Sequence, residues 1–401
     1  MLLGLFVTTI HMPGIPKLLW GEEQAFYILD STAANYIFGR QPISSAQGWQ
    51  NHGCYRLGSS QYYDMPLEAV LDGCNDDTVS QDHRDPSHPV HNIIKNMYHR
   101  RTQYPVLNDG YFLQSLSNQT RLVQLPGSNG TKSEFGMWSV MRNQYPDVQN
   151  LTEGTGSSQI WLVYSNEDRD VSYKFDCKDK DKAFISAFDA GTTVKNLFAP
   201  YDEIKLGNSS TALGIDGSEE FNGCVDELDM KAYDFRAYVP KASWLDPIPV
   251  ITKFSPGHDT QIESTKGAGD RDSLDIELQF SEAMDCDGIT KDLVITSDTE
   301  NDFSATVDED TVDCADISSL VSNLVGGSIS KWSWKATLKD VSHGIHTVTV
   351  KNATTKDGER FTNANDRFMI RIGAKNNPIA CLLYTSPSPR DRTRSRMPSS
   401  A

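Results

Sequence analysis

The sequence predicts a mostly β chain that opens with a short α/β segment and continues into two successive β domains. Residues 1–10 and 14–20 are almost continuously apolar, which is typical of elements buried inside an α/β domain. From residue 111 onward, short runs of alternating apolar and polar residues follow one another between Gly, Asn and Pro turns. That alternation indicates antiparallel strands.

The opening segment is expected to contain two helices and one strand. The run 1–10 suits a buried helix, and 14–20 suits a short strand. A turn-rich excursion over 31–80 follows, and loops of that length are usually functional or pinned. Apolar residues then recur at helical spacing over about 88–103, and Pro105 ends the pattern.

An all-β domain is expected next, followed by a small antiparallel β-sandwich at about 248–375. In the sandwich, alternation is strict around Leu278, Trp334 and Ile370. The runs 159–165 and 171–176 flank a charged turn and predict a hairpin. The expected strands of the all-β domain are 111–116, 121–125, 136–142, 159–165, 171–176 and 232–239.

Composition excludes several classes of function. The chain has 401 residues and a formal net charge of -17, which argues against nucleic acid as a partner because phosphate binding needs clustered Lys and Arg. No apolar run approaches the ~20 residues of a membrane span. Zinc-type Cys and His spacings, Gly-rich phosphate loops and Gly-x-Ser-x-Gly elbows are also absent from the sequence. We therefore expect no metal and no cofactor.

Cysteines and glycosylation triplets favour an extracellular or secretory location. Six Cys fall into three successive pairs, each inside one expected domain, although six Cys permit 15 pairings. The alternative is a reduced cytosolic protein whose Cys are small core residues. The disulfide candidates are Cys54, Cys74, Cys177, Cys224, Cys286 and Cys314, and the N-glycosylation candidates are Asn118, Asn129, Asn150, Asn208 and Asn352.

The last residues, 381–401, differ from the rest of the chain. They are rich in Ser, Pro and Arg and resemble a translated sequencing adapter. We expect a disordered, artefactual tail and leave it out of the fold.

Few residues suggest chemistry. Trp20, Glu22 and Glu23 stand at the carboxyl end of the expected buried strand, where barrel enzymes place their reacting groups. They are candidates for contact with a substrate, and the alternative is a strand end that only bonds to a neighbouring loop. Glycoside chemistry needs two placed carboxyls, and no partner carboxyl is identifiable. No catalytic residue is assigned.

Two charged clusters have simpler explanations. The segment 82–85 with His88 and His91 precedes the expected helix, where charges complement the start of a helix. The acidic stretch 308–313 does not match the spacing of a calcium loop and is expected to be a solvated loop.

Several longer motifs resemble one family. The run His11 to Glu23 looks like the segment around the eighth barrel strand of the α-amylase family of glycoside hydrolases. The more specific strings resemble the amylase-like extracellular part of fungal cell-wall α-1,3-glucan synthases. They are Asn35-Tyr-Ile-Phe-Gly-Arg-Gln-Pro42, Gly53-Cys-Tyr-Arg-Leu-Gly-Ser-Ser-Gln-Tyr62, Asp82-His-Arg-Asp-Pro-Ser-His-Pro89, Tyr104-Pro-Val-Leu-Asn-Asp-Gly110 and Tyr173-Lys-Phe-Asp-Cys177.

The resemblance implies three domains. Residues 1–108 would be the end of an amylase-like (β/α)8 TIM barrel, 109–240 an all-β amylase C-terminal domain, and 248–375 an immunoglobulin-like β-sandwich. It also implies a multi-pass membrane parent at the cell surface, with α-glucan as the partner. The family's catalytic carboxylates, which act by a retaining mechanism, would lie before Met1, so the chain itself is expected to be inactive.

Two other functions remain open from the sequence. One is a secreted α-amylase that hydrolyses α-glucan. The other is a non-catalytic carbohydrate-binding or spacer module. Retention on an α-glucan matrix would favour the module, and the residues to test are Trp138, Trp161, Trp332 and Trp334. For each of them, strand alternation favours core packing over contact with glucan.

Overall fold

A computed structural model describes residues 2–18, 23, 85–145, 147–151, 159–179, 181–209, 222–264, 266–267, 269–299, 302–317, 330–358 and 366–373. The chain divides into two compact units. Of the described residues, those within 2–23 and 89–249 belong to the first unit, and those within 85–88 and 250–373 belong to the second. Each unit has its own apolar core.

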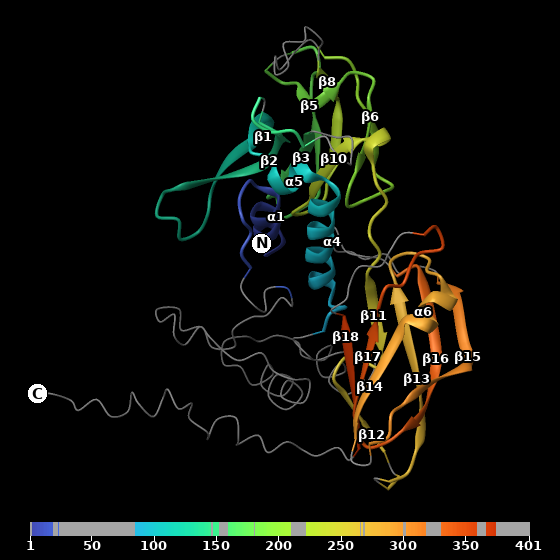
Figure 1. Cartoon of the computed structure of the whole chain (residues 1–401). Helices are drawn as coiled ribbons and strands as arrows, with labels where there is room; N and C mark the ends of the chain where they lie inside the picture. Colours follow the sequence, from blue (N-terminus) through green and yellow to red (C-terminus); the bar gives the residue numbers. More distant parts are fainter. Residues whose placement is uncertain are drawn as a thin grey trace, which may run out of the picture. The chain divides into compact units, whose positions relative to one another are not determined.

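The described residues at the start of the first unit form the helices α1 (Leu2–His11), α4 (Pro89–Gln103) and α5 (Pro105–Asp109). The structure confirms the helices expected over 1–10 and 88–103. Phe6 and Ile10 of α1 pack with Ile94 and Met97 of α4 around Phe235 of the neighbouring sheet. Figure 1 shows α1 and α4 beside the strands of this unit.

A six-stranded antiparallel sheet forms the body of the first unit (Figure 1). β3 lies in its middle between β2 and β10, and four consecutive residues, Ile160 to Val163, are buried. An apolar run without alternation fits a strand that is covered on both faces. In spatial order the strands are β1 (Phe112–Gln124), β2 (Lys132–Asn143), β3 (Gln159–Ser165), β10 (Phe235–Pro240), β6 (Thr193–Asn196) and β7 (Glu203–Lys205).

Two strand pairs cover one face of this sheet. β4 (Val171–Lys174) pairs with β9 (Glu227–Met230), and β5 (Phe184–Asp189) pairs with β8 (Asn222–Val225). Trp161 of β3 and Phe184 of β5 meet in the core between the layers, with ring centroids 5.2 Å apart. The expected hairpin of 159–165 with 171–176 is therefore wrong. β4 turns away to β9 because its apolar side chains complete the second layer.

The second unit is a sandwich of two four-stranded sheets, and Figure 1 shows its strands as two layers. One sheet has the order β11 (Ile251–Ser255), β13 (Asp272–Phe280), β16 (Trp332–Val341) and β15 (Thr306–Asp316). The other has the order β12 (Thr260–Glu263), β18 (Arg367–Gly373), β17 (Gly344–Val350) and β14 (Leu293–Thr299). The short helix α6 (Cys286–Asp292) precedes β14. Trp332, Trp334, Phe280 and Phe368 fill the core.

Two expectations are corrected here. Residues 15–18 form no strand, so the strand expected over 14–20 is wrong where it is described, and among the described residues of 2–110 only helices and connecting segments occur. No piece of a TIM barrel is evident in them. The physical reason is that a parallel strand needs hydrogen-bonded neighbours, and this stretch has none in the described chain.

The acidic stretch is the second correction. Residues 308–313 belong to the strand β15 rather than to a loop. Asp308 lies 2.6 Å from Nζ of Lys339 on the adjacent strand β16, so a cross-strand ion pair accounts for part of the charge.

Candidate functional site

Only one of the three strand-end candidates lies among the described residues. Trp20 and Glu22 lie outside them, and Glu23 is partly buried. Cys54 and Cys74 and the motif residues 82–84 also lie outside the described residues. The proposed contact of this segment with a substrate stays a prediction.

Three buried carboxyls in the described chain are held by arginines. Glu167, 3% exposed, receives two hydrogen bonds from Arg121, at 3.1 and 2.8 Å. Asp259, fully buried, lies 2.6 Å from Nε of Arg371. Asp234 is bonded in the same way by Arg236, at 2.9 Å. A glycosidase acid needs a protonated carboxyl aimed at a substrate, and carboxylates held by a guanidinium do not match that role.

The end of helix α1 is held by two buried arginines that the sequence reading missed. Arg142 donates from Nη1 to the carbonyl of His11 at 2.5 Å and from Nε to the carbonyl of Gly110 at 3.0 Å. Arg101 donates to the carbonyl of Ile10. Cations at a helix C-terminus satisfy its free carbonyls and oppose its dipole. The signal for Arg142 was a charge directly after the apolar pair Val140 and Met141 in a strand.

Burial lowers the pKa of the neighbouring imidazole. His11 is 2% exposed, and the charges of Arg142 and Arg101 add to the effect of burial, so its pKa falls to about 3. The ring packs edge-on against Phe198 at 5.4 Å between centroids. This imidazole is a neutral core group, and the cluster has a structural role, because it connects the end of α1 to α4 and β2.

Three of the four tryptophans proposed as glucan contacts are core residues. Trp161, Trp332 and Trp334 are at most 1% exposed. Trp138 on β2 is only partly buried, and its ring stacks on Tyr164 of β3, with centroids 5.8 Å apart and planes 19° from parallel. Tyr164 is 37% exposed, and the sequence reading missed it. Its signal was its place in β3, one residue beyond the buried run.

These two rings belong to a row that crosses the sheet. The register pairs Asn118 with Trp138, Trp138 with Tyr164, and Tyr164 with Phe235. Directly paired residues of antiparallel strands project from the same face, with Cβ atoms about 5 Å apart. Phe235 lies under α1 and α4, whereas Trp138 and Tyr164 reach the surface. The partly exposed pair, called here the Trp138–Tyr164 platform, is the candidate carbohydrate-contact surface of the described chain.

The five asparagines of the glycosylation triplets share one property, which is that all of them are exposed. Asn118 lies in β1, whereas the other four lie in turns or connecting segments. Exposure is what an attached glycan requires.

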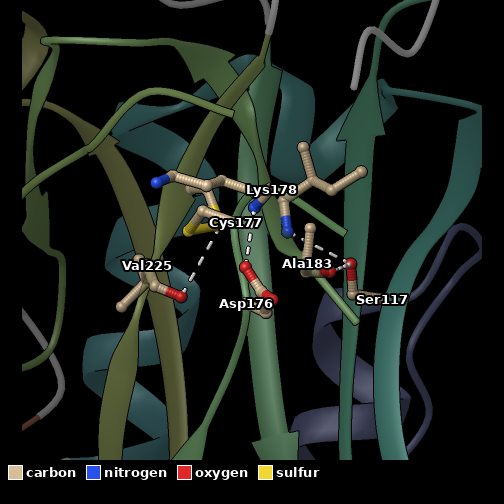
Figure 2. Close-up of a disulfide and its surroundings, with 8 residues drawn as sticks. Ser117, Asp176, Cys177, Lys178, Ala183 and Val225 are labelled. Atoms are coloured by element: carbon tan, nitrogen blue, oxygen red, sulfur yellow. Dashed lines mark hydrogen bonds between the residues drawn. A yellow bond between two sulfur atoms is a disulfide. The ribbon is translucent and has the colours of Figure 1, made fainter. Parts of the chain in front are cut away.

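Two disulfides occur in the described chain. Cys177 is joined to Cys224 across 47 positions in the first unit, and Cys286 is joined to Cys314 across 28 positions in the second. Figure 2 shows Cys177 between Asp176 and Lys178, in the segment that leads from β4 to Ala183. In the same view the hydroxyl of Ser117 donates to the carbonyl of Ala183 at 3.0 Å. The hydrogen bond joins β1 of the six-stranded sheet to the second layer, whereas the disulfide joins the segment before β5 to β8 within that layer.

Comparison with known proteins finds a matching family model for each β domain. Residues 111–244 match the family described as "Mok13-like, GH beta-sandwich domain". Residues 246–375 match the one described as "Mok13, Ig-like beta-sandwich domain". Two relatives come from Schizosaccharomyces pombe. The cell wall alpha-1,3-glucan synthase mok11 is 36% identical over 387 residues, and mok12 is 35% identical over 392 residues.

The chain is homologous to fungal cell-wall α-1,3-glucan synthases. Each of these two alignments covers 94% of this chain but 16% of the relative. The homology therefore includes both β domains and a small part of the relatives' length. Among the described residues, no helix has both the length and the apolar character that a membrane crossing requires.

Solved structures are more distant. A crystal structure of a MutB mutant in complex with glucose covers 59% of this chain and 38% of its own, with 12% identity and a TM-score of 0.24. Domains 4 and 5 of the S-layer protein SbsC cover 66% of this chain and 98% of their own, with 12% identity and a TM-score of 0.16. Both TM-scores are too low to indicate a shared fold.

Proposed function

We propose that this chain is a non-catalytic part of the outer, amylase-like portion of a cell-wall α-1,3-glucan synthase. The observation that carries the proposal is the homology to these synthases along 94% of the chain, through both β domains. The two disulfides and the five exposed glycosylation triplets support a place on the outer face of the membrane. The partner of the whole protein is α-glucan.

The chemistry belongs to other parts of such a synthase. The outer portion of the parent makes or remakes α-glucan linkages by a retaining mechanism with two carboxylates. The described carboxyls Glu167, Asp234 and Asp259 are each held by an arginine, which supports a chain that is inactive alone.

A chimera tests the proposal. The segment of an S. pombe α-1,3-glucan synthase that aligns with this chain is replaced by residues 1–380, and cell-wall α-1,3-glucan is measured in cells that lack the native enzyme. We expect glucan to be restored, and a chimera that reaches the cell surface but makes no glucan contradicts the proposal. The purified chain is also assayed on starch, where release of sugar would favour the α-amylase alternative.

The second candidate function is a module that holds glucan. One observation favours it, because Trp138 and Tyr164 form a partly exposed aromatic pair on one face of the sheet, and aromatic rings are enriched at binding surfaces. Co-sedimentation of the purified chain with insoluble α-glucan tests it, and Trp138→Leu is the variant that should abolish retention.

A further inference from the structure

Asn118 stands next to the Trp138–Tyr164 platform because of an irregularity in β1. The register of β1 against β2 shifts between Ser115 and Asn118, which marks a bulge. At the bulge, Ser117 faces the second layer of strands. Its hydroxyl donates to the carbonyl of Ala183 at 3.0 Å and accepts from the amide of Ile185 at 3.1 Å (Figure 2 shows the first of these).

The orientation of Ser117 fixes that of its neighbour. Successive side chains of a strand point to opposite faces, so Asn118 points to the face opposite β5. Trp138 is its direct partner in the register, and it lies on that same face. Two independent observations, the anchoring of Ser117 and the pairing of Asn118 with Trp138, thus place the amide of the triplet Asn118-Gln119-Thr120 beside a partly exposed aromatic pair.

We propose that Asn118 carries an N-linked glycan whose first N-acetylglucosamine packs on the Trp138–Tyr164 platform. The inference rests on the outer-face location in the proposed function. In the transfer, the Nδ2 of Asn118 forms a bond to C1 of the sugar while the bond from C1 to the phosphate oxygen of a lipid-linked diphosphate donor breaks. The Nδ2 proton goes to a base of the transferring enzyme, and the lipid diphosphate leaves.

The tether is the reason to prefer an attached sugar to a free glucan chain. The Cβ atoms of Asn118 and Trp138 lie about 5 Å apart as a direct cross-strand pair, so the encounter of a ring linked to Asn118 with the platform is intramolecular. A free polysaccharide must pay for its loss of translational and rotational freedom on binding. The pyranose ring covers apolar surface that Trp138 and Tyr164 otherwise expose at the edge of the helix-covered area.

The test is a double-mutant cycle on the whole chain, secreted from a yeast host behind a secretion leader. Glycan occupancy at each asparagine is measured by peptide mass mapping. Urea unfolding then compares wild type, Asn118→Gln, Trp138→Leu and the double variant. Leu keeps an apolar side chain at 138 and removes the flat ring. With Trp at position 138, we expect loss of the glycan to raise the equilibrium constant of unfolding by roughly threefold or more. With Leu at position 138, we expect loss of the glycan to leave that constant unchanged.

Two further variants make the result specific. Thr131→Ala removes the triplet at Asn129, in the turn of the same hairpin, and its effect should be the same with Trp or Leu at 138. Tyr164→Ala replaces Trp138→Leu if the latter fails to fold, with the same expected loss of coupling.

The outcomes separate the two proposals. Glycans on none of the five asparagines would refute the outer-face location itself. Glycans elsewhere but not on Asn118, or a glycan on Asn118 whose removal is equally costly with Leu at 138, would overturn only this inference. Stabilisation of Asn118→Gln by soluble α-glucan oligosaccharides, lost with Trp138→Leu, would also overturn it and make the platform a glucan site.

Discussion

Nη1 of Arg142, on β2, donates a hydrogen bond to the main-chain carbonyl of His11, the last residue of α1, at 2.5 Å. The two residues are 131 positions apart, so the contact ties the first helix to the sheet. Arg101 of α4 donates to the preceding carbonyl, that of Ile10. Helix α1 therefore ends between two buried guanidinium groups.

Replacing Arg142 is expected to detach this helix end. Arg142→Leu leaves the carbonyls of His11 and Gly110 without their donor, and we expect a loss of about 2 kcal/mol in the free energy of unfolding. Arg142→Lys is the matched control for charge, because it keeps the cation but cannot bond both carbonyls, and it should lose a similar amount. Urea unfolding measures both variants. A more stable Leu variant would mean that the desolvation of the buried guanidinium destabilises the fold by more than its hydrogen bonds stabilise it.

The first unit is expected to lose stability in mild acid. Burial, Arg142 and Arg101 lower the folded-state pKa of His11 to about 3, below the unfolded value near 6.5. The unfolded chain therefore binds a proton that the folded chain does not, and the free energy of unfolding falls as pH drops from about 6.5 toward 3. One such proton is worth up to ~1.4 kcal/mol per pH unit.

His11→Phe should reduce that slope by one proton. His99 on α4 acts in the same direction, since burial lowers its pKa to about 4, so the double variant His11→Phe/His99→Leu should be flatter still. Urea unfolding at several pH values between 4.5 and 7 gives the slopes. Equal slopes for wild type and His11→Phe would contradict the assignment.

The disulfide between Cys177 and Cys224 is expected to be a major source of stability in the first unit. It closes a span of 47 positions, and the loop-entropy relation assigns about 4 kcal/mol to such a link. In the double variant Cys177→Ser/Cys224→Ser, the free energy of unfolding should fall by about that amount, so the variant should unfold at a lower urea concentration. A peptide map without reductant provides the control, because it must show the two peptides joined in wild type.

Local sequence patterns predict where the helices and strands of this fold lie better than they predict which strands pair. Helical spacing located α4, an apolar run located β3, and alternation located β16 and β18, because those patterns reflect which side chains are buried. The hairpin of β3 with β4 was predicted wrongly. Nearness along the chain does not show that Tyr173 of β4 pairs with Leu228 of β9 in the second layer.

The candidate site shows the same limit. The sequence singled out Trp138 but could not separate it from Trp161, because the two side chains lie on opposite faces of the sheet and only the face of Trp161 is covered there by the second layer of strands. Tyr164 and the pairing of Asn118 with Trp138 depend on strand register, and the bulge at Ser117 alters that register without any Gly or Pro to mark it.

Gly136 is expected to be the least replaceable residue of the β1–β2 hairpin. It has a φ of +144°, and an added Cβ would overlap the carbonyl oxygen of Gln119 and lie 2.7 Å from Cα of Thr120. Backbone atoms of the paired strand cannot move aside without breaking the register that places Asn118 beside Trp138. Gly136→Ala should therefore cost about 3 kcal/mol or more.

Gly127, in the turn of the same hairpin, is the matched control. Its φ is +79°, but an added Cβ would meet nothing within 4 Å, so Gly127→Ala has only the intrinsic cost of the left-handed conformation, about 1 kcal/mol. Urea unfolding of the two variants measures the difference. Similar losses at both positions would show that conformational strain, and not the approach of β1, accounts for the glycine at 136.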